Sequence, residues 1–487
     1  MFAAFRAANP TEQDQFWSAR AGLDSIAGAP LARADTWSWA ADGIWYPNSP
    51  AWNLVLAVGW DWLGFRGLLL VAFVAICGYF ALGITAARAL GARALPSLLA
   101  WVPVIAASSA MLSARAPIAA QILMLGAVLL AWWWAARPAM ASRIREAILV
   151  ALAGLVLSLI GNWVHLSFML WAAVIAMVWS VVWALSPGVD LRRWVSVSCG
   201  GAVGLFLGCV LSPYGIPLTL ERSRVVAGVG RGLITEWQPV WEIGAVDWRG
   251  FVLAGIAVSS ASVSTWWTIG VVRSGGWRSR RAALAVPIAL IAVPATIAGI
   301  GTFRFLFVGM LMSLPLVAAA ASDAVRRLRR SRGGSRLLSN PRMIEYTSGR
   351  FWAVIVTGVC IVLLLPVLVA LRNDGRPDQA VLVADLPMGC RSFTDDRVAA
   401  LIIITRPDVK VWIDGRADFY GRDHIIDTVQ IYNGGQIPSG ADCAILPAVY
   451  PLADKLDRSA DWERFGTSAG YSAWVRHSEN AANDTRD

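Results

Sequence analysis

The sequence predicts a multi-pass, all-α membrane protein of about ten spans, followed by a small soluble α/β domain. Hydrophobic residues make up 57% of the 487 residues and charged residues only 15%, which is typical of membrane proteins. Several apolar runs reach the roughly 20 residues that one helical span needs. Three regions follow from this pattern: a first loop at 1–65, a transmembrane domain at 66–371 and a polar C-terminal domain at 372–487.

The apolar segments define ten expected spans and their orientation. The segments are 66–87, 95–113, 116–136, 146–164, 166–185, 194–213, 250–272, 282–300, 303–322 and 351–371. One set of loops holds 19 arginines: 88–94, 137–145, 186–193, 273–281 and 323–350. If these loops are cytoplasmic, the opposite side of the membrane part, including residues 1–65, holds 10 arginines and 10 acids. Positive loops stay in the cytoplasm. We therefore expect 1–65, 214–249 and 372–487 to lie outside the plasma membrane.

The N-terminal segment raises a question of insertion. Residues 1–20 contain no apolar core of a signal peptide, and no span precedes the first loop. We expect the natural chain to carry one more helix upstream; insertion of a short N-terminal tail from the cytoplasm is the alternative.

The C-terminal domain reads as alternating strands and helices. "KVWID" (410–414) and "DCAILP" (442–447) are typical of buried strands, and "RDHIIDTVQIY" (422–432) and "PLADKLDRSA" (451–460) of helices. "WERFGTSAGYSAWVRH" (462–477) predicts a hairpin around Gly470. In an oxidising compartment, Cys390 and Cys443 can form a disulfide, or both can be buried thiols.

Charge and cysteine patterns exclude several classes of function. The net charge of +10 comes from arginine clusters between spans, which indicates membrane orientation rather than nucleic-acid binding. No acidic residue lies in the middle of a predicted span and no inverted repeat is visible, which argues against an ion-coupled transporter. The six cysteines show no metal-binding spacing.

Acids and arginines gather instead on the predicted outer side. Glu12 and Asp14 lie in the first loop, while Arg115 and Arg304 lie beside span ends. Arginine grips phosphate through its planar fork, and a carboxylate can act as general base towards a hydroxyl group. Such a set suits an anionic, lipid-tethered substrate; the alternative is that these are solvated loop charges and bilayer-edge anchors.

The order of these motifs resembles a family of bacterial polytopic proteins related to the GT-C glycosyltransferases, which use polyprenyl-phosphate-linked sugars outside the membrane. The similar segments are "EQDQFWSARAG" (12–22), "ADTWSWAADGIWYPNSPAW" (34–52), "SARAPIAAQ" (113–121), "NWVHLSF" (162–168), "SPYG" (212–215), "ITEWQPVW" (234–241), "FRFLF" (303–307) and "VKVWIDGRADFYG" (409–421). The last is the most specific. Ala116 interrupts the third segment, and Trp163 stands in the fourth where asparagine is expected.

The resemblance implies a GT-C-like membrane fold and a hexosyl- or pentosyltransferase acting on an envelope glycan or glycolipid acceptor. Asp14 is then the first choice as catalytic base and Glu12 the second, and these two acids can also hold a divalent metal, the one cofactor that the resemblance admits. Arg115 and Arg304 would neutralise the donor phosphate. His165 either forms a hydrogen bond near the same cavity or is an ordinary residue at the end of its span whose hydrogen bonds are satisfied there.

Two questions stay open at the level of sequence. Arg416, Asp418 and Tyr420 of the "DGRADFYG" segment either bind the acceptor or hold the C-terminal domain together through ion pairs. The protein is either a glycosyltransferase or a non-catalytic relative that binds a glycolipid or a partner through its outer domain.

Overall fold

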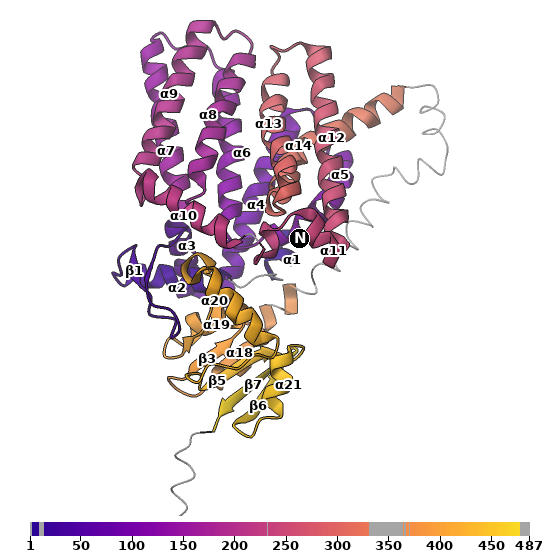
Figure 1. The fold of residues 1–487 in the computed structure, drawn as a ribbon. Helices are drawn as coiled ribbons and strands as arrows, with labels where there is room; N and C mark the ends of the chain where they lie inside the picture. Colours follow the sequence, from indigo (N-terminus) through magenta and orange to yellow (C-terminus); the bar gives the residue numbers. More distant parts are fainter. Residues whose placement is uncertain are drawn as a thin grey trace, which may run out of the picture. The chain divides into compact units, whose positions relative to one another are not determined.

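The computed structural model describes residues 2–8, 14–230, 232–330, 364, 367–369 and 371–477. The chain divides into two compact units (Figure 1). Unit 1 comprises Met1–Asn9, Ala72–Ser223 and Ile234–Val369, and unit 2 comprises Pro10–Val71, Arg224–Leu233 and Ala370–Asp487. Unit 2 therefore combines most of the first loop with the C-terminal region, which the sequence pattern presents as two separate domains.

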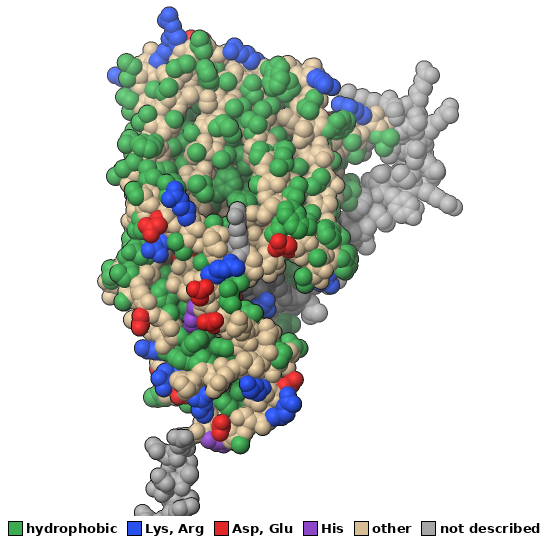
Figure 2. Space-filling model, viewed as in Figure 1, with side chains coloured by type: hydrophobic (Ala, Val, Ile, Leu, Met, Phe, Trp, Pro, Cys, Tyr) green, Lys and Arg blue, Asp and Glu red, His purple; other side chains and the backbone are tan. Residues whose placement is uncertain are grey.

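Unit 1 is a helical bundle. Its elements are α1 (Phe2–Ala8), most of α4 (Phe65–Ala89), α5 (Ala94–Ser108), the 3-10 turn η1 (Ser109–Met111), α6 (Ala116–Ala135), α7 (Arg143–Val164), α8 (Phe168–Leu185), α9 (Leu191–Val210), the first half of α10 (Gly215–Gly230), the 3-10 turn η2 (Thr235–Trp237), α11 (Val240–Val246), α12 (Arg249–Gly275), α13 (Ala282–Gly301) and α14 (Arg304–Arg330). Hydrophobic side chains cover the visible face of the long helices (Figure 2).

Eight of the helices in the described residues are long and apolar enough to cross a membrane: α4, α6, α7, α8, α9, α12, α13 and α14. The chain is thus a multi-pass membrane protein, and the predicted fold class is confirmed. Each of the first nine predicted spans coincides with a helix, although α5 is only 15 residues long. The tenth, 351–371, lies almost entirely outside the described residues.

Glycines allow helices α7 and α9 to pack backbone against backbone. A Cβ atom built on Gly204 would lie 1.8 Å from the carbonyl oxygen of Ala151, and one on Gly200 would lie 2.5 Å from that of Ala147. Small residues at a helix crossing are the usual means of close packing within a membrane. Near the start of both helices, the buried side chains of Arg193 and Glu146 form an ion pair of 2.7 Å.

Unit 2 contains the elements of the first loop: α2 (Asp14–Ile26), the two-residue strands β1 (Arg33–Ala34) and β2 (Ile44–Trp45), and α3 (Pro50–Leu63). Its C-terminal part contains α18 (Ala380–Ala384), β3 (Arg391–Thr394), α19 (Asp396–Thr405), β4 (Lys410–Val411), α20 (Ala417–Tyr432), β5 (Cys443–Pro447), α21 (Pro451–Asp457), β6 (Trp462–Ser468) and β7 (Tyr471–Arg476).

The five C-terminal strands form one mixed sheet in the order β4-β3-β5-β7-β6. Strand β3 is parallel to both β4 and β5, and β7 is antiparallel to β5 and β6. The strand residues Phe393, Leu446 and Trp474 form a buried core together with Leu452 and Leu456 of α21. Cys390 and Cys443 form a disulfide, with their Cα atoms 6.3 Å apart.

The predicted C-terminal elements are largely present, with two differences. The strand at 410–414 ends at Val411, and Asp414 then accepts a hydrogen bond from the backbone N–H of Arg416. The helix predicted at 422–432 begins earlier, at Ala417, with a kink at Gly421 where φ is 78°. The turn around Gly470, with φ of 79°, joins β6 to β7 as the hairpin pattern predicts.

The first loop extends the C-terminal sheet. The backbone N–H of Val411 donates to the carbonyl oxygen of Trp37 at 2.9 Å, and the N–H of Trp39 donates to the carbonyl oxygen of Val411 at 3.1 Å. Ser38 thus lies beside Val411 in a parallel bridge at the β4 edge. Helix α2 also packs against α19, so both ends of the sequence contribute to one folded unit.

Candidate functional site

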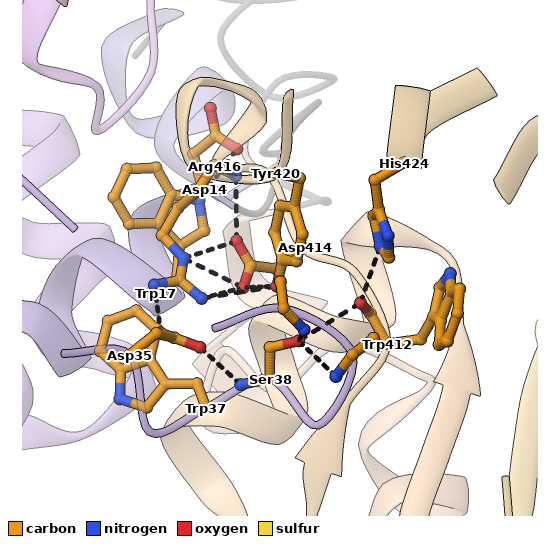
Figure 3. A network of polar contacts seen from close by, with 12 residues as sticks. Asp14, Trp17, Asp35, Trp37, Ser38, Trp412, Asp414, Arg416, Tyr420 and His424 are labelled. Atoms are coloured by element: carbon orange, nitrogen blue, oxygen red, sulfur yellow. Dashed lines mark hydrogen bonds and ion pairs between the residues drawn. The ribbon is translucent and has the colours of Figure 1, made fainter. Parts of the chain in front are cut away.

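The "DGRADFYG" segment forms a buried ion cluster at the centre of unit 2 (Figure 3). The guanidinium group of Arg416 donates to both carboxylate oxygens of Asp414, from Nε to Oδ1 at 2.8 Å and from Nη2 to Oδ2 at 2.6 Å. Its Nη1 donates to Oδ1 of Asp35, in the first loop, at 2.5 Å. The side chains of Arg416 and Asp414 have no exposed surface and that of Asp35 only 2%. One cation therefore joins two buried carboxylates that come from opposite ends of the sequence.

Aromatic rings enclose this cation. The Arg416 guanidinium carbon lies 4.4 Å from the ring centre of Trp37, 4.9 Å from that of Trp45 and 4.8 Å from that of Phe419. The hydroxyl group of Tyr420 donates to Oδ2 of Asp414 at 2.8 Å. Burial and the Asp414 charge raise the pKa of Tyr420 well above its usual range, so the phenol keeps the proton that it donates.

Asp14 lies beside the turn that carries Arg416. It is the first residue of α2, and the indole N–H of Trp17 donates to its Oδ1 at 3.3 Å. A Cβ atom built on Gly415 would lie 2.8 Å from the same oxygen. Gly415 therefore leaves room for the Asp14 carboxylate, and the Arg416 cluster fixes the backbone against which this carboxylate rests.

Two further acids lie at the start of α19. Asp395 is buried, caps the helix by accepting the N–H of Val398 at 3.0 Å, and accepts the hydroxyl of Tyr471 at 2.8 Å. The side chain of Asp396 reaches solvent, yet the surrounding protein and the charges of Asp395 and Asp14 raise its pKa to about 6. The Asp396 carboxyl group thus lies within electrostatic reach of both Asp395 and Asp14.

In unit 1, two predicted phosphate-binding arginines share one carboxylate. Both terminal nitrogens of Arg115 donate to Oε1 of Glu236 at 3.2 Å. Nε of Arg304 lies 3.9 Å from Oε2 of the same side chain. Burial raises the pKa of Glu236, but the charges of Arg115 and Arg304 outweigh this effect and lower it below its usual value. Glu236 is therefore a carboxylate held between two guanidinium groups.

His165 belongs to the same group of residues. It ends α7, and its Nδ1 lies 3.1 Å from the backbone nitrogen and 2.6 Å from the hydroxyl oxygen of Ser167. Burial and the positive charges of Arg304 and Arg115 lower the pKa of His165 to about 3. The imidazole is therefore neutral at physiological pH and adds no charge to the site.

The structure places the predicted site residues as follows. Arg115, Arg304 and His165 come together in unit 1, whereas Asp14, Arg416, Asp418 and Tyr420 belong to unit 2. Arg416 and Tyr420 are buried around Asp414, and Asp418 is only partly exposed. Glu12 lies outside the described residues. Within the described part of the chain, no three His, Cys, Asp or Glu residues are arranged to hold a metal ion.

Two residues of these clusters escaped the sequence analysis as site residues. Asp35 opens the "ADTWSWAADG" segment, but its partner Arg416 lies 381 positions away, so no local pattern links them. Glu236 is part of the "ITEWQPVW" motif. That motif was the available signal in the sequence. Glu236 is identified as a site residue only because Arg115 and Arg304 both contact it.

Comparison with known proteins gives limited likenesses. No protein-family model and no curated protein matches the chain. The oligosaccharyltransferase of Archaeoglobus fulgidus, solved with a tethered acceptor peptide that contains the NVT sequon, is similar with a TM-score of 0.48 and 11% identity over 98% of this chain and 74% of that chain. Archaeal oligosaccharyltransferase AglB from Archaeoglobus fulgidus, in complex with an inhibitory peptide and a dolichol-phosphate, is similar with a TM-score of 0.39 and 10% identity, over 98% and 73%. Both TM-scores lie below 0.5, so these likenesses assign neither a family nor an activity to the chain.

Proposed function

We propose that the protein is a membrane glycosyltransferase that transfers a sugar from a polyprenyl-phosphate donor to a cell-envelope acceptor on the outer face of the plasma membrane. The observation that carries this proposal is the convergence of Arg115 and Arg304 on one carboxylate within a multi-pass bundle. Two guanidinium groups that hold a carboxylate offer the planar, cationic donors that also bind a phosphate group.

The reaction divides into two roles. The acceptor hydroxyl gives its proton to the Asp14 carboxylate, and its oxygen forms a new bond to the anomeric carbon of the sugar. The bond between that carbon and the phosphate oxygen breaks with inversion, and its electron pair leaves with the polyprenyl phosphate. Arg115 and Arg304 stabilise the charge that develops on this leaving group.

The side of the membrane is supported by two independent observations. The arginine-rich loops between the spans are expected to stay in the cytoplasm, which favours an outer position for the first loop and the C-terminal domain. The buried pair of Asp35 and Arg416 requires these two segments to fold on the same side, because both partners lie within one unit. Together the two observations support an outer position for Asp14.

Sugar transfer in a reconstituted system tests the proposal. Purified protein in vesicles is given labelled polyprenyl-phosphate sugars and an envelope lipid extract, and labelled acceptor is measured. The double variant Arg115→Gln, Arg304→Gln is expected to lose transfer and donor binding together, because the phosphate loses both cations. Arg249→Gln is the matched control, since Arg249 is exposed and, like Arg304, is the first residue of a membrane-crossing helix.

The outcomes separate the two candidate functions. Loss of transfer in the double variant, with Arg249→Gln active, supports a glycosyltransferase. Donor binding that requires Arg115 and Arg304 but is never followed by transfer supports the non-catalytic alternative. Transfer that survives the loss of both arginines contradicts the assigned phosphate site.

A further inference from the structure

Glu236 occupies the position that an anionic ligand would take between Arg115 and Arg304. Its two carboxylate oxygens are divided between the guanidinium groups, with Oε1 at 3.2 Å from Arg115 and Oε2 at 3.9 Å from Arg304. A phosphate group bound to the same arginines would present its oxygens to the same donors. The protein carboxylate and a ligand phosphate therefore cannot occupy this place together.

The segment that carries Glu236 is built so that its side chain can leave. Glu236 is the middle residue of the single 3-10 turn η2, and the flanking Ile234 and Gln238 have extended backbones. The side chain keeps 21% of its surface exposed. The carbonyl oxygen of Gln238 accepts the N–H of Phe303 at 3.0 Å, which anchors the segment beside the start of α14. Movement of Glu236 together with its short turn, with Gln238 still anchored, can thus open the site.

The charges of the group also favour exchange. Among these four side chains, the two arginines are positive, Glu236 is negative and His165 is neutral. When the Glu236 carboxylate moves away, the two guanidinium groups lose one negative partner. A sugar phosphodiester carries one negative charge, whereas the polyprenyl phosphate that remains after transfer is a monoester and carries about two.

We propose that Glu236 is a built-in competitor for the lipid phosphate: it holds the Arg115–Arg304 site when no ligand is bound, and it disfavours the doubly charged product more than the singly charged donor. This inference rests on the proposed function for the identity of the ligand. The displaced Glu236 carboxylate stays close to the bound phosphate, and the repulsion between them grows with the phosphate charge. Glu236 therefore weakens binding of both lipids but assists release of the product.

Binding measurements on the full chain in nanodiscs test this inference. The probes are farnesyl phosphate, which is a monoester, and methyl farnesyl phosphate, which is a diester, each titrated calorimetrically into the protein. Glu236→Gln keeps the size of the side chain and removes its charge. It is expected to tighten binding of the diester about tenfold and of the monoester about a hundredfold, because the same repulsion acts on twice the charge.

The matched control is Glu242→Gln, since Glu242 is exposed on the neighbouring α11 and is expected to change either affinity less than twofold. Equal or weaker binding by Glu236→Gln would overturn the inference and leave Glu236 as a fixed structural clamp. Failure of the wild-type protein to bind either lipid would overturn it as well. So would a variant that binds inorganic phosphate more tightly but neither lipid more tightly.

A second measurement does not depend on the variant. Hydrogen exchange of the 232–238 segment in the wild-type protein is expected to rise when farnesyl phosphate binds, because Glu236 loses its two partners. Unchanged exchange at saturating ligand would contradict the displacement. Neither experiment measures sugar transfer, so the two proposals can fail separately. A protein that shows both effects but no transfer in the reconstituted assay would refute the proposed function and leave the role of Glu236 intact.

Discussion

Loss of Arg416 is expected to open the contact between the first loop and the C-terminal sheet. In Arg416→Met, the buried carboxylates of Asp414 and Asp35 are left without the cation that they share. Removal of one partner from a buried ion pair costs about 3–5 kcal/mol. Asp35→Asn is expected to cost less, because the bidentate pair between Arg416 and Asp414 remains complete.

Hydrogen exchange measures this effect locally. The amides of Val411 and Trp39 are protected by the hydrogen bonds that join the two segments, and a loss of 3 kcal/mol would raise their exchange about a hundredfold. Arg391→Gln is the control, because the ion pair of Arg391 with Asp442 is about half exposed on both sides and such pairs contribute about 0–1 kcal/mol. Equal protection in Arg416→Met and Arg391→Gln would refute the reasoning that burial makes this cluster important.

Three further predictions follow from the same structure. Asp14→Asn is expected to abolish sugar transfer while expression and membrane insertion stay normal; retained transfer would remove Asp14 from the mechanism. The pKa of Asp396 is raised to about 6, so the stability of unit 2 should fall as the pH rises from about 4 to 6. Asp396→Asn should reduce this dependence, to which the raised pKa of Asp395 also contributes, and should stabilise the unit at pH 7. Hydrogen exchange at several pH values measures both effects, and a variant as pH-dependent as wild type would contradict this. Gly204→Ala should lower the free energy of unfolding by about 1–3 kcal/mol or more, because its methyl group meets the carbonyl oxygen of Ala151. It should therefore reduce the monodisperse fraction in size-exclusion chromatography. Gly255→Ala, with open space around the new methyl group, should not.

The membrane spans could be predicted because one physical requirement dominates them. A helix in lipid must be apolar over its whole length, so composition alone locates α4, α6 to α9 and α12 to α14. The C-terminal strands β5, β6 and β7 were predictable because turn residues bound them. The segment of β3 and α19 was missed, since the run "VAALIIIT" is buried on all sides and lacks the periodicity that separates a helix from a strand.

The candidate site was predictable only in part, because its contacts are between distant positions. Arg115 and Arg304 could be proposed from their places beside span ends, but their common partner Glu236 depends on how three separate loops converge. The buried state of Arg416 was likewise one of two interpretations of "DGRADFYG". Its partner Asp35 determines that state, and the sequence alone does not indicate this pairing.

These pairings also constrain how the chain crosses the membrane. Between Asp35 and Arg416 lie eight helices long enough to cross, together with the 15-residue α5 and the predicted span 351–371. Partners in one buried ion pair lie on the same side, so the number of crossings between them is even. If all eight long helices cross, α5 can cross only if one further crossing lies between α14 and Arg416; the predicted span 351–371 lies almost entirely outside the described residues.

The proposed function requires that α5 crosses. Arg115 follows Asp14 by α4 and α5, so the two reach the same side only if α5 spans the bilayer despite its length. In that case Ala92 and Ala139 lie on the cytoplasmic side, because α5 and α6 separate them by two crossings. The experiment uses a variant in which serine replaces the cysteines of the spans. Single cysteines introduced at positions 92 and 139 should resist a membrane-impermeant maleimide in intact cells, while a cysteine introduced in place of Asp42 should react. Opposite labelling of positions 92 and 139 would show that α5 does not cross, and Asp14 could then not act on a lipid phosphate held by Arg115.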